Sequence, residues 1–365
     1  MLRVAIDARP LAHPHTGIGR YLSQLLKHLH AEGDLRLFLY GARPDQVPIQ
    51  GPVVRSLPLP YPRALSHLAG QIYFPVWAAR DRIDVFWSPR HHLPLLTNKP
   101  CILTVHDTVA FDAPQTLPLG NRLLEWALMR PSINKARRIV AVSNYTKGRI
   151  EALCSGSASR LSTSYEASFL TPAASSPRRG DFILFVGTLQ PRKNLSTLLR
   201  AYQAFAAHYP NPKPLVIAGA PTRGYDLVNL VNSLEIAERV RFVRPDDTAL
   251  AELYDNCDFV VLPSIDEGFG LPIVEAMAYD KPVIAANAGA LPEIGGGAGL
   301  YFDPDQPTEL ARLMQSLSDD PELYLRLSRQ ARMESRRFSW QTAAAQLTDL
   351  FKQCTAVSAA GTEPR

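Results

Sequence analysis

The sequence predicts an α/β protein made of two doubly wound, Rossmann-like domains, and three observations lead to this prediction. The chain has 365 residues, whereas a single domain usually has roughly 100–200. Short apolar runs alternate with helical patterns in both halves, which is typical of parallel sheets covered on both faces. A stretch of small residues and prolines without periodicity separates the two halves.

The alternation and the break divide the chain into five segments. We expect a first domain over residues 1–170, a linker over 171–181, a second domain over 182–337, a C-terminal helix over 338–355 that packs back on the first domain, and a flexible tail over 356–365. The halves share no internal sequence repeat at solenoid periods, so their similarity is architectural.

In the first domain, a strand is expected first, then a turn that contains glycines, then an amphipathic helix. These elements fall at residues 2–6, 15–20 and 21–30. Further buried strands are expected at 35–40, 84–87, 101–105 and 138–142, and a helix at 121–130. Ser143 is expected to cap the helix that starts near Asn144.

The second domain repeats the alternation directly after the linker. Strands are expected at 182–186, 215–218, 240–243, 259–263 and 282–286. Helices are expected between and after them, at 195–209, 226–237, 248–256 and 272–279.

The composition excludes several classes of protein. The chain is 46% hydrophobic and 20% charged, and it has no run of ~18 apolar residues, which argues against integral membrane and disordered proteins. Asp7 interrupts the N-terminus after three apolar residues, so no secretory signal is expected and the protein should remain in the cytoplasm. The four cysteines lie far apart, and we expect free, buried thiols rather than a zinc site or disulfides.

The positive charge is concentrated in the first half. Residues 1–170 contain 20 Lys and Arg against 11 Asp and Glu, a net +9, whereas the remainder has a net charge of −4. This charge suits an anionic partner: a phospholipid surface, a lipid-linked diphosphate or nucleic acid. A solvated basic surface without a partner is the alternative.

The loop after the first strand of the second domain combines groups that suit a diphosphate. Gly187 and Thr188 leave the strand, and Arg192, Lys193 and Asn194 precede the next helix. Asn194 is placed to cap this helix. A helix N-terminus with two cations binds phosphate groups well. The alternative is that both cations are ordinary solvated charges.

A second loop of interest follows the fourth strand of this domain. Pro272 suits the first turn of a helix, and Gly268 and Gly270 allow the backbone to approach a ligand closely. Glu267 and Glu275 lie eight positions apart and can contact different parts of one elongated ligand, such as sugar hydroxyls. The alternative is that Glu275 only stabilises its helix and Glu267 is solvated.

These two loops resemble the donor-binding motifs of the retaining glycosyltransferases of family 4, the second being similar to their Glu-x7-Glu motif. That family has the GT-B fold, in which two Rossmann-like domains face each other across a cleft. The similarity covers about residues 2–352 and includes Thr16-Gly17-Ile18-Gly19-Arg20-Tyr21, Val105-His106-Asp107, Val142-Ser143 and Phe338-Ser339-Trp340. Within the family, Asp7-Ala8-Arg9-Pro10 with the following Gly-Ile-Gly-Arg-Tyr resembles bacterial mannosyl- and rhamnosyltransferases of surface-polysaccharide assembly.

The resemblance implies a nucleotide-diphosphate sugar as donor. Arg192 and Lys193 would hold the diphosphate and neutralise it as it leaves, Glu275 would bind the ribose, and Glu267 would bind hydroxyls of the transferred sugar. His106 would face this sugar from the first domain. The implied catalytic residues are Glu267, His106, Lys193 and Arg192, and the implied donor-binding residues are Gly17, Gly187, Thr188, Arg192, Lys193, Glu267, Gly268, Phe269, Gly270, Leu271 and Glu275.

The mechanism implied by the resemblance keeps the reaction on one face of the sugar, with the departing phosphate taking the proton of the acceptor. Preorganised cations are then the main requirement. Asp303-Pro304-Asp305 resembles a metal motif, but a turn and a helix start explain its carboxylates. No catalytic metal and no cofactor besides the donor are expected.

The sequence departs from the family pattern in two places. Arg244-Pro245 replaces a usual glycine, which leaves the contacts to the nucleobase open, and Tyr165-Glu166-Ala167-Ser168 replaces the usual approach to the linker. Arg90, His91 and Asp107 are expected to contact the acceptor, although an ordinary polar loop explains them equally well. The resemblance also implies that the segment 57–77, which mixes prolines and aromatic residues, meets acceptors and membrane surfaces, so an anionic membrane surface is a further expected partner.

The sequence thus favours a retaining hexosyltransferase that moves mannose from GDP-mannose to a glycan or lipid-linked saccharide in O-antigen or exopolysaccharide biosynthesis. UDP- or dTDP-sugars and rhamnosyl or glucosyl transfer remain open. A sugar-nucleotide epimerase of the same fold and a non-catalytic nucleotide-sugar binder are further alternatives. A nucleic-acid binder is disfavoured because the basic residues are dispersed along the chain.

Overall fold

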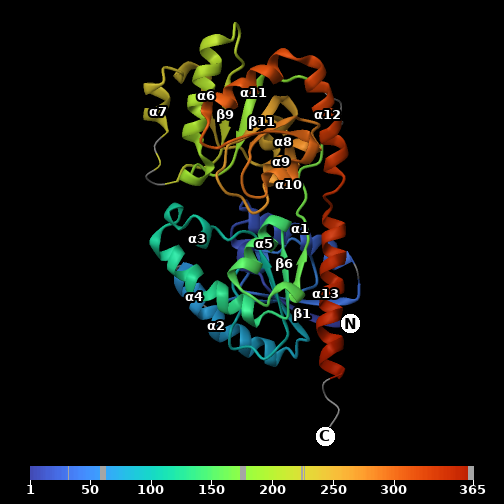
Figure 1. The fold of residues 1–365 in the computed structure, drawn as a ribbon. Helices are drawn as coiled ribbons and strands as arrows, with labels where there is room; N and C mark the ends of the chain where they lie inside the picture. The colour runs from blue at the N-terminus through green and yellow to red at the C-terminus, as the bar shows by residue number, and fades with distance from the viewer. Residues whose placement is uncertain (32, 58–62, 173–177, 223–224, 226, 361–365) are drawn as a thin grey trace. The chain divides into compact units, whose positions relative to one another are not determined.

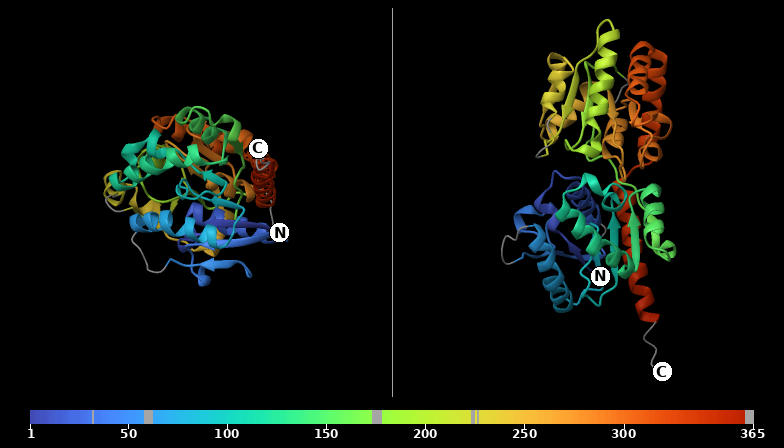
Figure 2. Two further views of the ribbon diagram at one scale, coloured as in Figure 1. Left: turned by 90° about the horizontal axis from the view of Figure 1, so that it is seen from below. Right: turned by 60° about the vertical axis from the view of Figure 1, so that its left-hand side comes forward.

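The computed structural model describes residues 1–31, 33–57, 63–172, 178–222, 225 and 227–360 (Figure 1). The chain forms two compact units, of which the first comprises Met1–Glu166 and Ser339–Arg365 and the second Ala167–Phe338. Each has its own parallel sheet with helices around it, as the further views in Figure 2 show. The prediction of two Rossmann-like α/β domains is therefore confirmed.

The first unit is built on a seven-stranded parallel sheet with the order β3-β2-β1-β4-β5-β6-β7. Its strands are β1 (Leu2–Asp7), β2 (Leu35–Tyr40), β3 (Val53–Arg55), β4 (Val85–Ser88), β5 (Cys101–Val105), β6 (Arg138–Ala141) and β7 (Leu161–Thr163). Its helices are α1 (Gly17–Ala31), α2 (Arg63–Arg80), α3 (Val109–Asp112), α4 (Leu119–Lys135), α5 (Asn144–Leu153) and α13 (Trp340–Ala360).

Alternation along the central strands decides which helices cover which face of this sheet. On β4, Phe86 packs in a core cluster that includes Phe74 of α2 and Met129 of α4. The next residue, Trp87, points to the opposite face, where its ring lies 6.1 Å from that of Phe351 on α13. Both side chains are fully buried, so helices cover both faces, as expected for a parallel sheet.

The C-terminal helix belongs structurally to the first unit. Helix α13 packs against α1, β4 and β5, and the rings of Trp340 and Tyr21 meet edge to face with 5.8 Å between centroids. The helix continues through residues 356–360, beyond the predicted end at 355. The physical reason is that 354–360 contain neither glycine nor proline and include three alanines, which favour helix. Residues 361–365 lie outside the described part.

The second unit is built on a six-stranded parallel sheet with the order β10-β9-β8-β11-β12-β13. Its strands are β8 (Phe182–Val186), β9 (Leu215–Ala218), β10 (Val240–Val243), β11 (Cys257–Leu262), β12 (Val283–Ala286) and β13 (Gly299–Phe302). Its helices are α6 (Leu195–His208), α7 (Val228–Ser233), α8 (Asp247–Asn256), α9 (Leu271–Ala278), α10 (Leu291–Gly295), α11 (Pro307–Asp319) and α12 (Pro321–Ser335).

The predicted linker over 171–181 overlaps the body of the second unit. Arg178 forms an ion pair of 2.7 Å with Asp255, and the amide of Asp181 donates to the carbonyl of Asn256 at 3.0 Å. The second unit begins already at Ala167. Residues 178–181 of the predicted linker thus contact the end of α8, and residues 173–177 lie outside the described part.

Several elements were not predicted from the sequence. Among them are the short edge strands β3, β7 and β13, which have three or four residues each and are mostly half-buried. The helix expected at 226–237 is reduced to α7, because Glu235 adopts a positive φ of 56° that ends it. Among the described residues, no helix is both long and apolar enough to span a bilayer.

Leu103 on β5 tests the core of the first unit. This side chain is fully buried, so Leu103→Ala should lower the free energy of unfolding by about 2–5 kcal/mol. Urea unfolding followed by circular dichroism measures this change. Leu96→Ala is the matched control, because Leu96 is 70% exposed, and it should change the free energy by less than about 0.5 kcal/mol. Equal effects of both substitutions would contradict the assigned core.

Candidate functional site

The first predicted donor loop leaves β8 and returns into α6. Gly187 is half-buried and Thr188 is exposed, and a short 3-10 turn then places Arg192 and Lys193 immediately before the helix. Asn194 adopts a left-handed conformation with φ of 52°, and its side chain does not cap α6. The capping prediction is therefore wrong, because the amide Nδ2 of Asn194 instead donates to the carbonyl of Pro304 at 2.9 Å.

The second predicted donor loop leaves β11 and enters α9. Gly270 precedes the helix with φ of 102°, a left-handed conformation that favours glycine, and Pro272 occupies the first turn as expected. Gly268 and Phe269 are buried, and Leu271 is half-buried. The ring of Phe269 meets that of Phe338 edge to face, with 5.8 Å between centroids.

The two loops meet at the carboxylate of Glu267, which is 7% exposed. Arg192 Nη1 donates to Glu267 Oε2 at 2.7 Å and to the carbonyl of Asp266 at 2.9 Å, and Lys193 Nζ donates to the other carboxylate oxygen of Glu267. The amide of Ile265 donates back to the carbonyl of Arg192 at 3.0 Å. The structure thus brings together three residues that were selected from separate motifs. We call Arg192, Lys193 and Glu267 the cation–acid cluster.

The electrostatics of this cluster keep the acid ionised. Burial raises the pKa of Glu267, but the charges of Arg192 and Lys193 and their hydrogen bonds outweigh burial and lower it to about 2. Glu267 therefore stays a carboxylate at neutral pH and cannot donate a proton. It can accept hydrogen bonds, as a ligand for hydroxyl groups would.

Glu275 lies on α9 and is 2% exposed. The hydroxyl of Tyr254 on α8 donates to Glu275 Oε2 at 2.6 Å, and the Tyr254 ring stacks with that of Tyr279 with 5.8 Å between centroids. Tyr254 thus orients the buried carboxylate of Glu275. The sequence analysis did not find Tyr254, because a tyrosine within a helical pattern carries no signal of its own.

The turn after β12 fixes the backbone of Glu267. The amide of Ala290 donates to the carbonyl of Glu267 at 2.8 Å. Gly289 has φ of 59°, and a Cβ atom there would lie 2.6 Å from the backbone nitrogen of Glu267. Only glycine therefore fits at this position. The sequence analysis missed Gly289, and its place in the loop that follows the buried strand β12 was the available signal.

His106 in the first unit is held by two oxygen atoms of the protein. Its Nδ1 lies 2.8 Å from Glu166 Oε1, its Nε2 lies 2.9 Å from the carbonyl of Pro89, and its ring meets that of Tyr21 edge to face at 4.8 Å. Both ring nitrogens therefore already have partners in this unit. Glu166 is 3% exposed and was seen in the sequence only as part of a departure from the family pattern.

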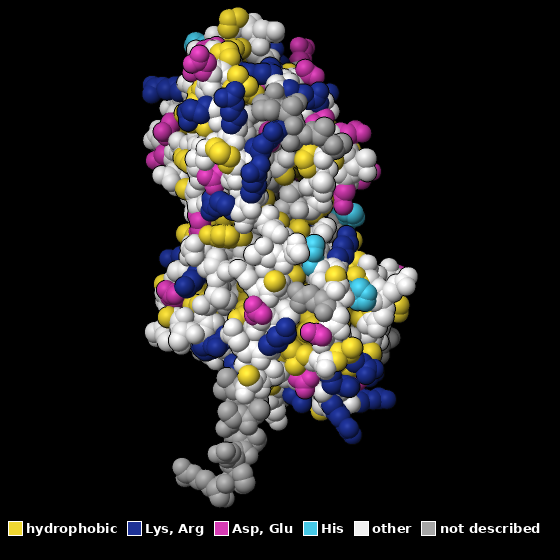
Figure 3. Space-filling model, turned by 90° about the vertical axis from the view of Figure 1, so that its right-hand side faces the viewer, with side chains coloured by type: hydrophobic (Ala, Val, Ile, Leu, Met, Phe, Trp, Pro, Cys, Tyr) yellow, Lys and Arg dark blue, Asp and Glu magenta, His cyan; other side chains and the backbone are white. Residues whose placement is uncertain are grey.

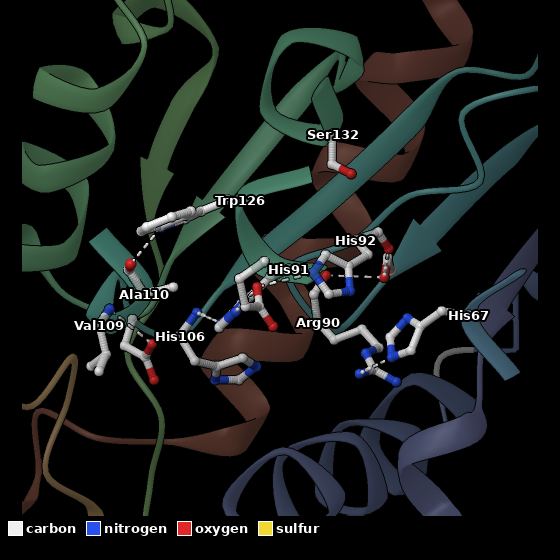
Figure 4. Close-up of polar contacts among 12 residues, drawn as sticks. His67, Arg90, His91, His92, His106, Val109, Ala110, Trp126 and Ser132 are labelled. Atoms are coloured by element: carbon white, nitrogen blue, oxygen red, sulfur yellow. Dashed lines mark hydrogen bonds and ion pairs between the residues drawn. The ribbon is translucent and has the colours of Figure 1, made fainter. Parts of the chain in front are cut away.

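The predicted acceptor residues Arg90 and His91 take part in two neighbouring groups of polar contacts, which Figure 4 shows. The backbone amide of His106 donates to His91 Nε2 at 3.2 Å. Arg90 Nη2 lies 3.3 Å from His67 Nε2. Burial, followed by the charge of Arg90, lowers the pKa of His67 to about 3, so His67 is neutral and can accept this hydrogen bond.

Glu125 on α4 anchors the group that contains His91. Its Oε2 lies 2.9 Å from His92 Nε2 and 3.4 Å from His91 Nδ1. Burial raises the pKa of Glu125, but hydrogen bonds and charge from both histidines outweigh it, so the pKa is lowered. The third predicted acceptor residue, Asp107, lies at the start of α3, where its Oδ1 accepts a hydrogen bond from the amide of Val109 at 3.2 Å.

The predicted donor-binding glycine Gly17 is the first residue of α1 and is exposed. Gly19, by contrast, is required sterically, since a Cβ there would lie 2.2 Å from the carbonyl oxygen of His13.

The segment 303–305 forms a turn rather than a metal motif. Asp303 Oδ1 accepts a hydrogen bond from the amide of Asp305 at 2.9 Å, which agrees with a turn. In the part of the chain that the structure describes, no group of three His, Cys, Asp or Glu side chains is arranged to hold a metal ion.

Comparison with known proteins agrees with both units. Residues 15–166 match the model of "Glycosyltransferase Family 4", and residues 171–334 match that of "Glycosyl transferases group 1". The O-antigen chain mannosyltransferase B of Escherichia coli is 30% identical over 385 residues, which cover 96% of this chain and 100% of that protein.

Solved structures show the same fold. Sucrose-phosphate synthase from Thermosynechococcus elongatus superposes with a TM-score of 0.79 at 22% identity, covering 98% of this chain and 100% of that one. The Anabaena protein HepE, solved with UDP-glucose, superposes with a TM-score of 0.75 at 19% identity, covering 97% of this chain and 100% of that one. Together with the full-length relative and the two family models, these matches show that the chain belongs to the glycosyltransferases of family 4 and has their GT-B fold.

Proposed function

We propose that this glycosyltransferase is a retaining mannosyltransferase that transfers mannose from GDP-mannose to a saccharide, carried on a lipid diphosphate, in the assembly of a surface polysaccharide. The observation that carries the proposal is the convergence of Arg192 and Lys193 on the buried carboxylate of Glu267. The similarity to the O-antigen mannosyltransferase over the whole chain supports mannose as the sugar. The reaction would take place in the cytoplasm, at the membrane.

The cation–acid cluster has the properties that departure of a diphosphate requires. As the bond between the anomeric carbon and the phosphate oxygen breaks, negative charge grows on that oxygen. Arg192 and Lys193, already oriented by Glu267, would bind this charge without reorganisation, and such preorganised groups contribute strongly to catalysis. Glu267 would then exchange its contacts with the cations for hydroxyl groups of the sugar.

Glu275 and Tyr254 would bind the nucleoside end of the donor. The carboxylate of Glu275, which the hydroxyl of Tyr254 orients, can accept hydrogen bonds, and this chemistry suits the hydroxyl groups of a ribose. The acceptor oxygen would form its bond to the anomeric carbon on the face that the phosphate leaves, and its proton would pass to the departing phosphate. In this mechanism the enzyme supplies position and charge, and no side chain forms a bond to the sugar.

Donor identity can be read from thermal stability. A ligand that binds only the folded protein raises the melting temperature, and at 100 times its Kd it adds about 2.7 kcal/mol to the free energy of unfolding. We expect GDP-mannose to raise the melting temperature more than UDP-glucose, dTDP-rhamnose or GDP alone, measured by differential scanning fluorimetry. A larger rise in melting temperature with UDP-glucose would contradict the proposed donor and favour glucose as the transferred sugar. Product mass after incubation with acceptor separates a transferase from an epimerase or a binding protein.

The roles of the acidic and basic residues predict different kinetic defects. Lys193→Ala and Glu267→Ala should each lower kcat about 10²–10³-fold, because each removes a preorganised group from the reacting centre. Glu275→Ala should mainly raise KM for the donor, because it removes binding to a part of the substrate that does not react. Steady-state transfer assays measure both constants, with Glu252→Ala, an exposed glutamate, as the control. Wild-type kcat in either of the first two variants would refute the assignment.

The low pKa of Glu267 predicts how stability depends on pH. A carboxylate whose pKa is lower in the folded state than in the unfolded chain, where it is about 4.3, stabilises the fold above that value and loses this contribution as the pH falls toward about 2. The difference in free energy of unfolding between the wild type and Glu267→Gln should therefore shrink as the pH is lowered from 6 to about 3. Urea unfolding at several pH values measures it. A difference in free energy of unfolding that stays constant over this pH range would contradict an ionised Glu267 in the cation–acid cluster.

A further inference from the structure

Glu166 is a buried acid of the first unit. On the face of the molecule that Figure 3 shows, acidic side chains lie at the surface among basic and apolar ones. Glu166, by contrast, is 3% exposed, and it is the last residue of the first unit. It belongs to the segment 165–168, in which the sequence departs from the family pattern. An acid in such a place needs a partner, because an unpaired charge is costly to remove from water.

The partner of Glu166 is the ring of His106, the residue that follows β5. His106 Nδ1 lies 2.8 Å from Glu166 Oε1, and Nε2 lies 2.9 Å from the carbonyl oxygen of Pro89. A carbonyl oxygen can only accept a hydrogen bond, so Nε2 carries a proton. The backbone amide of His106 is held as well, since it donates to His91 Nε2 at 3.2 Å (Figure 4). The contacts thus make Nε2 a donor and turn Nδ1 toward the acid.

Tyr21 restricts the same ring from a third direction. The rings of Tyr21 and His106 meet edge to face, with 4.8 Å between centroids and 89° between planes. The hydroxyl of Tyr21 lies 3.4 Å from Thr104 Oγ1, and the indole of Trp87 donates to this same oxygen at 3.0 Å. On α13, the ring of Trp340 packs edge to face against Tyr21. Tyr21 is therefore fixed by its neighbours and limits rotation of the His106 ring.

The segment that carries Glu166 is tied to the sheet and to α5. The amide of Ser164 donates to the carbonyl of Ala141, the last residue of β6, at 2.9 Å. Asn144, the first residue of α5, donates from Nδ2 to the hydroxyl of Tyr165 at 2.9 Å. These contacts lie within two residues of Glu166 and fix the backbone from which its side chain extends. The acid and the ring are therefore both held before any substrate binds.

We propose that Glu166 is a positioning residue for His106, whose carboxyl group binds Nδ1 and so keeps Nε2 protonated and aimed at an acceptor oxygen. In this structure that oxygen is the carbonyl of Pro89, and a hydroxyl group of the substrate would take its place. The hydrogen between Nδ1 and Oε1 can belong to either atom, and in both cases Nε2 is a donor. The inference rests on the proposed function in one respect, namely that His106 contacts the transferred sugar.

The first test observes the ring directly and needs neither donor nor acceptor. The chain has nine histidines, so in protein labelled with ¹⁵N-histidine the His106 signals are assigned as those absent from His106→Asn. We expect a proton on Nε2 of His106 in the wild type and in Glu166→Gln, whose amide can donate to Nδ1. In Glu166→Ala the ring should exchange between its two neutral tautomers. A wild-type ring that carries its proton on Nδ1 alone would overturn the inference.

The second test separates position from charge. Glu166→Ala should lower kcat and kcat/KM together by about 10–100-fold, the size of loss found when the partner of a metal-bound histidine is removed. Glu166→Gln should keep kcat within about threefold of the wild type, because its amide still binds Nδ1. Glu151→Ala is the matched control, since Glu151 is an exposed acid on α5, and it should behave like the wild type. A loss of about tenfold or more in Glu166→Gln would contradict a positioning role.

A double-mutant cycle shows whether Glu166 acts through His106. If it does, Glu166→Ala added to His106→Asn should lower kcat no further than His106→Asn alone, within about twofold. Two losses that multiply would instead show that Glu166 acts independently of the ring, and the inference would fail. Differential scanning fluorimetry shows which variants fold. If Glu166→Ala does not fold, the ring signal of the wild type and the kinetics of Glu166→Gln remain decisive.

Failure of this inference and failure of the proposed function give different results. If GDP-mannose is not the donor, the wild type transfers nothing from it, and the protonation of the His106 ring still reports on Glu166. If the wild type transfers mannose although Nε2 of His106 carries no proton, the proposed function stands and the role of Glu166 is refuted.

Discussion

The pairing of β8 with β11 is the constraint on which the candidate site depends. These strands are parallel neighbours in the sheet of the second unit, so the loops at their carboxyl ends emerge side by side, although they are more than 70 residues apart in sequence. Arg192 and Lys193 leave one strand and Glu267 leaves the other, and they meet without any long excursion of the chain. This edge is where open α/β sheets bind their ligands. Parallel pairing therefore creates the cation–acid cluster.

In the proposed function, the cluster serves ligand binding rather than stability. Removing a carboxylate and two cations from water costs about as much free energy as their attraction returns, and apolar residues of similar size would often stabilise a fold equally well. What the ion pairs do provide is orientation: both cations point at one small volume, and Gly289 and Ala290 hold the backbone of Glu267 in place. A site that must bind a dianion in one position needs this rigidity.

The first unit uses carboxylates differently. Glu166 and Glu125 are bound to histidines rather than to Arg or Lys, and they hold the loops after β4 and β5 against each other through His106 and His91. The net charge of this unit is strongly positive, and eight of the 14 large apolar side chains that are exposed among the described residues lie on α2, on α4 and in the loop between β4 and β5. The contacts between acids and histidines thus organise the polar loops at the end of the sheet. The helices that cover one face of the sheet expose apolar side chains instead.

The sequence by itself determined the elements whose signal is local. Strands at 35–40, 101–105, 182–186, 215–218 and 240–243 coincide with β2, β5, β8, β9 and β10, because short apolar runs flanked by polar residues carry the pattern of buried strands. Ser143 was also predictable: its hydroxyl accepts from the amide of Thr146 at 3.0 Å, a contact made within one helical turn. Motifs with glycine, proline and paired glutamates selected Arg192, Lys193, Glu267 and Glu275 for the same reason.

Tertiary structure alone decided the partners of these residues. Glu166 meets His106 across 60 positions and Tyr254 meets Glu275 across 21, and no local pattern encodes such distances. Asn194 was expected to cap a helix. Its side-chain amide instead donates a hydrogen bond to the carbonyl of Pro304, because a segment 110 residues further along the chain lies beside it. The exposure of Leu68 and Ile72 could likewise not be predicted, since the sequence pattern of an apolar helix is the same whether other elements cover one side of it or both sides. Sequence patterns reflect interactions between residues that are close in the chain. Burial and long-range contacts, by contrast, arise only when the sheet forms.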